Sequence, residues 1–413
     1  MFYIPIKLVN FNTFKNTLTL IIIFEKISNY NLNTDYSFKI YNATTELPTS
    51  WNDLAVSTIF LSKDYLEVLE KSSPENMICK FIGIFENDIL IGIAISQFLN
   101  LNMLKSYGGR DKCIKTVARN IIFRNFASHV LIIGNNMLTG QNAHALCKTI
   151  DKKKALQTLY SATNELKKIF NSKGISIHIT TYKDFNKEEI NNFGIQEFKK
   201  DYQFSTQPNM IFSINKNWKS EQDYIDLLSK KYRDQYKRAR KKAIEIEKRK
   251  LELEEIIFLE DIIYDLYFHV AKNAPFNTFF LPKNHFRVFK EIFKDKFLFY
   301  GYFIDDKLIG FNTLIKNGEV MDTYFLGYDE SIQREKMLYL NMLYDMIAYS
   351  INKEFKQIVF GRTALEIKSS VGAKPAIMYG VIAHTNSYVN PFMSKIFKYL
   401  EPETTWQERN PFK

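Results

Sequence analysis

The sequence predicts an α/β protein made of two similar domains in tandem, each built around a mixed β-sheet. The first observation is an internal repeat, because residues 82–92 recur 218 positions later as residues 300–310 with six identical residues. The second is that a strand, a helix and a strand follow the repeat in both halves. The third is length, since 413 residues with 46% hydrophobic content are enough for about two to three domains.

Each copy of the repeat is expected to form a β-hairpin. An apolar run leads into Asn87-Asp88 in the first copy and into Asp305-Asp306 in the second, and another apolar run follows each pair. Pairs of this kind favour tight turns between antiparallel strands. A period of 218 residues is far too long for a solenoid, so it indicates two copies of one domain.

The first domain is expected to span residues 41–214, after a strand-rich leader of unknown role at residues 1–40. Its hairpin should be followed by a strand, a polar loop, a helix and a strand, at residues 129–133, 135–151, 152–170 and 175–180. Gly134 is expected to close the first of these strands and Gly174 the helix. The strand–helix–strand order implies a parallel pair with a right-handed crossover.

The second domain, residues 215–413, should repeat this arrangement. A strand at residues 320–326, closed by Gly327 at a place equivalent to Gly134, precedes a helix at 335–352 and a strand at 357–360. A hairpin, antiparallel strands and one parallel crossover are the order of the GCN5-related N-acetyltransferase (GNAT) fold. The fold class we expect is therefore α/β with tandem GNAT-like domains and a charged helical segment between them.

That charged segment includes a basic helix predicted at residues 221–250. Residues 229–242 hold eight basic residues and one acid, with charges on every face, so the helix is not a membrane-type amphipathic helix. Tyr232 and Tyr236 are spaced to stack on a base or sugar. Contact with RNA or an acidic substrate and a plain solvated helix are both open interpretations. The candidate contact residues are Lys231, Tyr232, Arg233, Lys237 and Arg238.

The segment with the most chemistry is residues 361–375, which follows a predicted parallel strand. Ligands of open α/β sheets bind beyond such carboxyl ends. Arg362 offers a planar fork for a carboxylate or phosphate, Glu366 a base, and Lys368 a charge over a developing oxyanion. The alternative is a solvated turn and helix with ordinary surface charges. Further substrate-binding candidates are Thr363, Tyr328, Gly372 and Ala373.

Several other classes of protein are excluded or disfavoured. Cys79, Cys113 and Cys147 are too far apart for a metal site or a disulfide framework, so a reduced cytoplasm is expected. No metal-binding histidine spacing, Walker A loop or GxSxG elbow occurs. The apolar run 18–24 is too short to span a membrane, which leaves peripheral membrane contact open. A net charge of +11 suits anionic partners, although a composition typical of an AT-rich genome explains it equally well.

Residues 229–242 and the segment Gly361, Arg362, Thr363, Ala364, Leu365, Glu366, Ile367, Lys368 resemble the Fem-like N-acyltransferases. These double-GNAT proteins include the peptidoglycan-bridge aminoacyl ligases, and the resemblance covers about residues 40–413. It implies acyl or aminoacyl transfer to an amine, with Lys368 and Gly372-Ala373 at the transfer site. The acceptor it suggests is a cell-envelope precursor or an amino lipid.

The same resemblance suggests a transient donor and no permanently bound cofactor or metal. Residues 333–338 lack the glycines of the acetyl-CoA loop of ordinary GNATs, so acetyl-CoA is disfavoured. A longer acyl-CoA, an acyl carrier or an aminoacyl-tRNA is expected instead, which makes tRNA a candidate partner. Two rival functions stay open, an RNA-binding protein and an inactive module that recognises envelope precursors.

Overall fold

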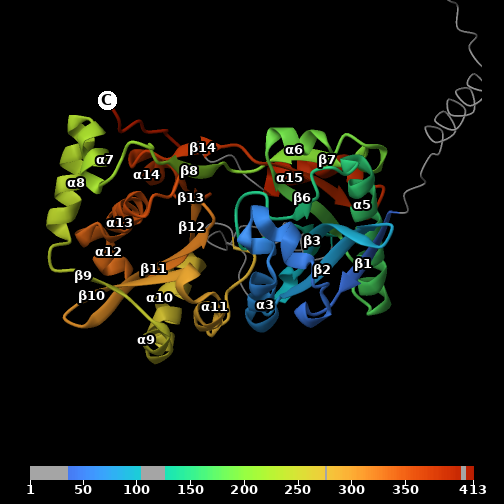
Figure 1. Ribbon diagram of the computed structural model, residues 1–413, viewed down its shortest axis with the longest axis horizontal. Coiled ribbons are helices and arrows are strands. Elements are labelled where there is room, and N and C mark those ends of the chain that lie inside the picture. Colours follow the sequence, from blue (N-terminus) through green and yellow to red (C-terminus); the bar gives the residue numbers. More distant parts are fainter. Residues whose placement is uncertain (1–35, 104–125, 275–276, 401–405) are drawn as a thin grey trace, which may run out of the picture.

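The computed structural model describes residues 36–103, 126–274, 277–400 and 406–413, which form two units side by side, each with its own mixed sheet (Figure 1). The α/β fold class is confirmed. Residues 1–35 of the expected leader, the apolar run 18–24 and Cys113 lie outside the described residues. Residues 36–40 do not belong to a leader, because they form β1 (Tyr36–Tyr41), whose backbone pairs with β2 (Met77–Glu86).

The first sheet runs in the order β1-β2-β3-β4-β6-β15-β7, with β5 paired to β3. Its other strands are β3 (Ile89–Asn100), β4 (His129–Ile133), β5 (His144–Leu146), β6 (Ile179–Phe185), β7 (Tyr202–Ser205) and β15 (Tyr379–His384). The accompanying helices are α2 (Trp51–Leu54), α3 (Lys63–Ser72), α5 (Lys152–Ser172), α6 (Lys187–Asn191) and α15 (Met393–Leu400). β4 and β6 are parallel, and α5 makes the crossover between them, as expected.

The second sheet runs in the order β14-β8-β13-β12-β11-β10-β9. Its strands are β8 (Asn209–Ser213), β9 (Glu247–Lys250), β10 (Phe297–Ile304), β11 (Lys307–Asn317), β12 (Val320–Tyr328), β13 (Gln357–Gly361) and β14 (Lys374–Ala376). Its helices are α7 (Glu221–Leu227), α8 (Lys230–Lys242), α9 (Leu253–Phe258), α10 (Glu260–Asn273), α11 (His285–Phe293), α12 (Glu330–Lys336), α13 (Leu338–Asn352) and α14 (Leu365–Ser370). β12 and β13 are parallel, with α13 as the crossover.

The two predicted hairpins are confirmed, and they agree in detail. Asn87-Asp88 and Asp305-Asp306 all have positive φ, as a two-residue turn between twisted strands requires. The β2–β3 register shifts between Ile84 and Phe85, and the β10–β11 register shifts 218 positions later. The hairpins lie in different sheets, so the repeat marks two units of one architecture.

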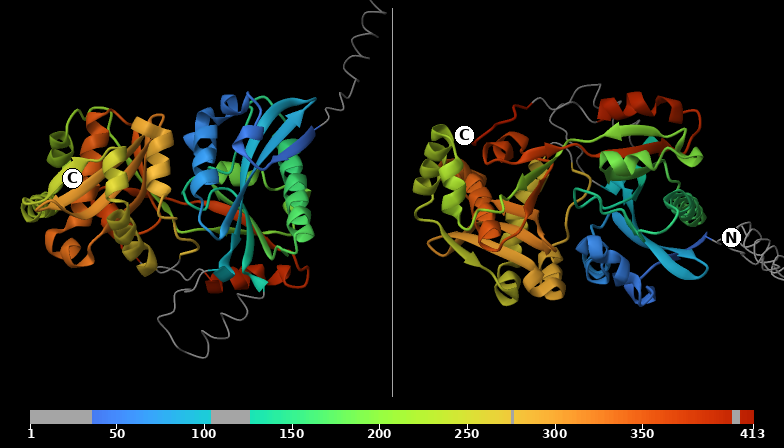
Figure 2. Two further views of the ribbon diagram at one scale, coloured as in Figure 1. Left: turned by 90° about the horizontal axis from the view of Figure 1, so that it is seen from below. Right: turned by 45° about the horizontal axis from the view of Figure 1, so that its top comes forward.

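The two units exchange a strand. β8 follows the first unit in the sequence but pairs with β13 and β14 of the second sheet. β15 follows the second unit but pairs with β6 and β7 of the first sheet. The chain therefore returns to the first unit near its C-terminal end (Figure 2). The expected domain boundary at residue 214 therefore does not separate the two sheets. Backbone pairing places β8, which precedes the boundary, in the second sheet and β15, which follows it, in the first.

Some expected elements differ locally. The basic helix expected at 221–250 is two helices, α7 and α8, and it gives way to β9, which pairs with β10. Gly327 lies inside β12 and does not end it. A glycine is required there by packing, because a Cβ would meet the backbone of α10 at 2.5 Å. The helix expected at 335–352 is broken at Met337, whose φ of 52° separates α12 from α13.

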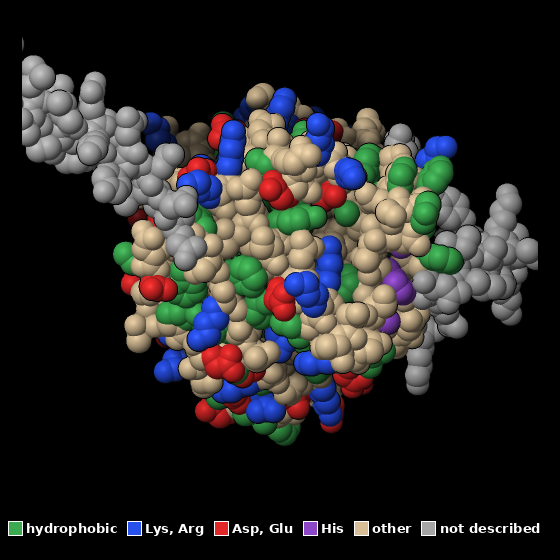
Figure 3. All heavy atoms as spheres, turned by 90° about the vertical axis from the view of Figure 1, so that its right-hand side faces the viewer, with side chains coloured by type: hydrophobic (Ala, Val, Ile, Leu, Met, Phe, Trp, Pro, Cys, Tyr) green, Lys and Arg blue, Asp and Glu red, His purple; other side chains and the backbone are tan. Residues whose placement is uncertain are grey.

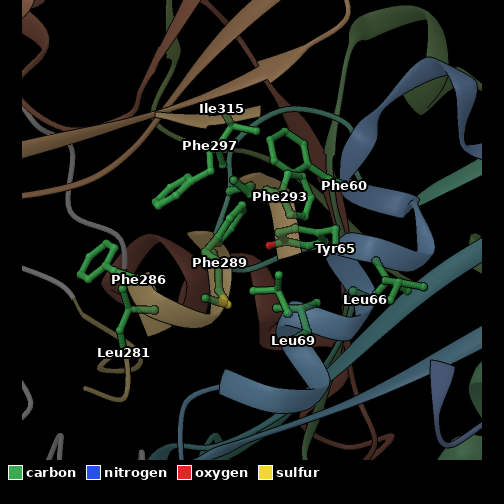
Figure 4. Packing of buried hydrophobic residues seen from close by; sticks show 14 of the residues in the cluster. Phe60, Tyr65, Leu66, Leu69, Leu281, Phe286, Phe289, Phe293, Phe297 and Ile315 are labelled. Atoms are coloured by element: carbon green, nitrogen blue, oxygen red, sulfur yellow. The ribbon is translucent and has the colours of Figure 1, made fainter. Parts of the chain in front are cut away.

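One of the clusters of buried apolar residues joins the two units. Helices α3 and α11 pack against each other, so that Phe60 and Tyr65 of the first unit meet Phe289 and Phe293 of the second (Figure 4). The ring centroids of Tyr65 and Phe289 are 6.0 Å apart in an edge-to-face arrangement. Burial of large aromatic side chains on both sides holds the units as one body.

Candidate functional site

The predicted segment after β13 forms one wall of a cavity of about 810 Å³ in the second unit. The start of α13, helix α8 and the C-terminal tail form the other walls. The lining residues are Gln207, Lys231, Tyr232, Gln235, Met337, Leu340, Arg362, Thr363, Ala364, Leu365, Glu366, Ile367, Ser370, Trp406 and Arg409. The cavity lies just beyond the carboxyl end of β13 and beside the start of the crossover helix α13, and ligand sites of open α/β sheets also lie beyond the carboxyl ends of strands.

A second cavity of about 590 Å³ occupies the corresponding place in the first unit. There the start of the crossover helix α5 supplies Lys152 and Leu156, and α6, which follows β6, supplies Glu189. In the second unit the same two walls are the start of α13 and helix α14. The repeat thus extends from the hairpins to the cavities, and the larger one is lined by Arg362, Thr363 and Glu366 of the residues predicted from sequence.

Arg362 lies on the wall of the larger cavity, as predicted, and its partner comes from the other unit. Its guanidinium forms an ion pair with the carboxylate of Asp184, at the end of β6. Asp184 is 1% exposed and also pairs with Lys183, whose Nζ lies 2.7 Å from it. Asp184 was not selected in the sequence analysis.

Glu366 also lines the cavity, but it forms an ion pair with Arg409 of the C-terminal tail. The Nε of Arg409 donates to its carboxylate at 3.0 Å, and the backbone N–H of Arg409 donates to the hydroxyl of Ser369. Glu366 and Arg362, which are four residues apart in the sequence, do not pair with each other. Arg362 precedes α14 and turns toward the first unit, so the two side chains take different partners.

Lys368 lies beneath this cavity and is not among its lining residues. It is 4% exposed, and its Nζ donates to the backbone carbonyl of Phe360 at 2.5 Å and to that of Gly361 at 3.4 Å. Burial lowers the pKa of its ammonium group to about 7. The ammonium group therefore stands at the carboxyl end of β13, one layer behind the cavity surface.

Three predicted substrate-binding residues do not line this cavity. Gly372 has a φ of 108°, and a Cβ there would lie 2.6 Å from the ring of Phe412, so it permits close approach of the tail and not of a ligand. The N–H of buried Ala373 donates to the carbonyl of Lys368 at 3.1 Å. Tyr328 packs against Tyr339 away from this cavity, with ring centroids 6.3 Å apart.

Helix α8 has two distinct faces, which corrects the expectation of charges all round. Tyr232 and Ala239 are buried, and the hydroxyl of Tyr236 donates to Glu221 at 2.9 Å, so one face of the helix packs against the protein. Among the predicted contact residues, Lys231 and Tyr232 line the cavity, whereas Arg233, Lys237 and Arg238 do not. The exposed face carries Lys230, Lys231, Lys237, Arg238, Lys241 and Lys242.

The C-terminal tail supplies cavity residues that sequence reasoning missed. Trp406 and Arg409 line the cavity. The backbone of Phe412 forms an isolated antiparallel β-bridge with Leu228, just before the start of α8. Polar residues at strand ends could have indicated Asp184, but no local pattern indicates where a tail docks.

Within the described ranges, no group of three or more His, Cys, Asp or Glu residues is arranged to hold a metal ion. The same residues include no helix with the length and hydropathy needed to cross a bilayer.

The chain is similar to several solved structures. One is described as FemX, with 10% identity and a TM-score of 0.49, covering 83% of this chain and 96% of that one. A tandem GNAT protein from the clavulanic acid biosynthesis pathway has 7% identity and a TM-score of 0.49, covering 85% and 99%. L-PGS from Bacillus licheniformis has 10% identity and a TM-score of 0.43, covering 81% and 94%. No protein-family model and no curated protein matches the sequence.

The element order within both units is that of the double-GNAT fold expected from the sequence. Each unit has a hairpin, a following antiparallel strand and one parallel crossover, and a cavity lies beside the start of each crossover helix. The reaction must be argued from the chemistry of the larger cavity, because a fold alone does not specify a function.

Proposed function

We propose that this protein is an N-acyltransferase that transfers an acyl or aminoacyl group to an amine acceptor in the larger cavity. The observation that supports this most is the position of that cavity, just beyond the carboxyl end of the parallel strand β13 in a GNAT-ordered sheet, with Arg362 and Lys231 on its walls. A cavity of about 810 Å³ is within the usual range for a small-molecule or cofactor site. A cell-envelope precursor or an amino lipid is the acceptor class we favour.

The proposed reaction needs few groups. The neutral amine forms a bond to the acyl carbon, the carbon–sulfur or carbon–oxygen ester bond breaks, and the amine's surplus proton passes to a base or to water. Glu366 is the carboxylate on the cavity wall that could receive it. Lys368 could stabilise the developing oxyanion only if its ammonium group exchanged the carbonyl of Phe360 for the acyl oxygen.

The donor we favour is a large anionic carrier, either a longer acyl-CoA, an acyl carrier or an aminoacyl-tRNA. Helix α12 and Met337 precede α13 where ordinary GNATs have a glycine-rich loop, so the chain offers no close backbone approach for a pyrophosphate there. The exposed basic face of α8 ends beside the cavity at Lys231. A polyanionic carrier could lie along this face and place its acyl end inside.

Native mass spectrometry of the purified protein tests the proposal. An acyl thioester, an acylated amine or an aminoacyl ester should co-purify with the wild type. Thr363→Trp should abolish this, because Thr363 is exposed on the cavity wall and a bulky ring there fills the space without disturbing the core. Thr363→Ala is the matched control and should retain the ligand. Recovery of the same acyl compound from Thr363→Trp would contradict the assignment of this cavity.

Nucleic-acid binding without transfer is the second candidate function, and the basic face of α8 is the observation that favours it. Six of its exposed side chains are cationic along the length of the helix, with Asp234 as the acid among them. On the end of the molecule formed by the first unit, basic and acidic side chains are instead interspersed (Figure 3). Phosphate contacts along α8 would give binding that weakens steeply with salt.

A further inference from the structure

A charged residue on the wall of the larger cavity is held by a residue of the first unit. β6 and β13 are the corresponding second strands of the two crossovers, and their carboxyl ends meet at the junction of the units, where Asp184 reaches Arg362. These residues are 178 positions apart in the chain. The wall of a cavity in one unit thus depends on a carboxylate from the other.

The backbone around Asp184 is shaped to deliver this contact. Phe185 pairs with Tyr379 and Lys183 pairs with Gly380, so Asp184 is the extra residue of a β-bulge between β6 and β15. Its φ of 72° is in the left-handed region, which is costly for a residue with a side chain but best tolerated by Asp and Asn. Bulges re-aim side chains, and here the strained residue is the one that pairs with Arg362.

The β13 strand ends in a matching irregularity. Its register with β8 shifts between Val359 and Gly361, and Arg362 follows directly after Gly361, whose φ is 78°. Both irregularities form against an exchanged strand, β15 on β6 and β8 on β13. The strand exchange therefore sets the geometry of both partners of the ion pair.

The charges at this junction favour an anion. The buried carboxylate of Asp184 lies between two cations, Lys183 and Arg362, so the three groups together carry one positive charge. The Nζ of Lys183 also donates to the carbonyl of Asn135 at 3.2 Å, which fixes it to the first unit. A guanidinium held in this way is pre-oriented for the carboxylate or phosphate of a ligand.

We propose that Asp184 is a positioning residue that orients Arg362 to bind an anionic group of the ligand in the larger cavity. The proposal rests on the proposed function only for the identity of that ligand. A positioning role for Asp184 differs from a purely structural ion pair in the direction in which anion affinity changes when the carboxylate is removed. Loss of the negative charge alone should strengthen anion binding, whereas loss of positioning should weaken it.

Fluorescence of Trp406 on the cavity wall can report binding, with Trp406→Phe to identify its share of the signal from the three tryptophans. The probes are inorganic pyrophosphate and succinate, which separate a phosphate site from a carboxylate site. The wild type should bind one of them saturably. Asp184→Asn retains the shape and the left-handed conformation, and it should weaken that binding about tenfold.

The double variant decides the mechanism. Arg362→Gln should weaken binding at least as much as Asp184→Asn, and combining the two should add little, because they remove one interaction. Glu319→Gln, which breaks an exposed ion pair with Lys356, is the matched control and should leave binding unchanged. Unchanged or tighter binding in Asp184→Asn, additive effects, or a wild type that binds neither anion would overturn the proposal. Coupled anion binding without any acyl transfer would instead count against the proposed function alone.

Discussion

The ammonium group of Lys368 donates to the backbone carbonyl of Phe360 over 2.5 Å, within the protein and directly behind the larger cavity. Phe360 belongs to the irregular end of β13, so the lysine stabilises the strand end from which Arg362 extends. The role of this lysine can be tested by substitution, because its charge affects both stability and the proposed chemistry.

Lys368→Met should lower turnover about 100- to 1,000-fold if the ammonium group stabilises the oxyanion, since the variant retains length and packing but loses the charge. Single-turnover rates with the donor found by mass spectrometry would measure this. Turnover within about threefold of the wild type would show that the lysine is only structural.

The pH dependence of stability gives a second measure of Lys368. Its folded pKa of about 7 lies below the ordinary 10.5, so between these pH values the unfolded chain binds a proton that the folded chain lacks. Wild-type stability should therefore gain a contribution as pH rises from about 7 to about 10. Urea unfolding at several pH values should show this rise in the free energy of unfolding, and Lys368→Met should lack the rise. Lys356→Met, an exposed change, is the control and should retain it.

Arg362→Ala and Glu366→Gln should separate the two charged residues of the cavity wall. Arg362→Ala should abolish anion binding and activity, because it removes the guanidinium that Asp184 holds. Glu366→Gln breaks an exposed ion pair with Arg409 and should cost no more than about 1 kcal/mol of stability. If Glu366→Gln also lost activity at unchanged ligand affinity, Glu366 would be the base.

Gly372→Ala should destabilise the protein by about 1–3 kcal/mol, because the new Cβ would meet the Phe412 ring and the backbone has a positive φ. Gly318 is the matched control, since it also has a positive φ but a Cβ added there would have nothing within 4 Å. Thermal unfolding should show a larger loss for Gly372→Ala than for Gly318→Ala. Equal losses would mean that the tail contact contributes nothing.

Asp322→Asn should flatten the stability profile at mildly acidic pH. Burial raises the pKa of Asp322 to about 7, so the folded chain keeps a proton that the unfolded chain releases above about pH 4. Wild-type stability should fall as pH rises from about 4 through about 7 on this account, and the variant should lack this fall. Asp305→Asn, in an exposed hairpin turn, is the control and should behave like the wild type.

Charge reversal on α8 tests the carrier-binding face. The double variant Lys237→Glu and Arg238→Glu should weaken binding of tRNA. It should also make log affinity fall less steeply with log salt concentration, by the amount that about two phosphate contacts contribute. Filter binding at several salt concentrations would measure it. The matched control reverses Lys153 and Lys173, which are exposed on the first unit. The same loss in both pairs would indicate nonspecific charge attraction.

Much of the architecture could be predicted because it is encoded locally. The Asn87-Asp88 and Asp305-Asp306 turns adopt positive φ for steric reasons that involve only their own residues. The position of Arg362 after a parallel strand followed from the order of elements. The partners of the site residues could not be predicted in this way, because pairing with Asp184 or Arg409 depends on which distant surfaces pack together.

By itself, the sequence determined that the chain has two α/β units with matching hairpins and a charged segment beyond the last parallel strand. These features depend on turn sterics and on hydrophobic periodicity, which act over a few residues. Only the tertiary structure decided that β8 and β15 change sheets, that Lys368 is buried, and that the tail closes the cavity. These outcomes depend on burial and backbone pairing between segments that are far apart in the chain, where no short pattern specifies the partner.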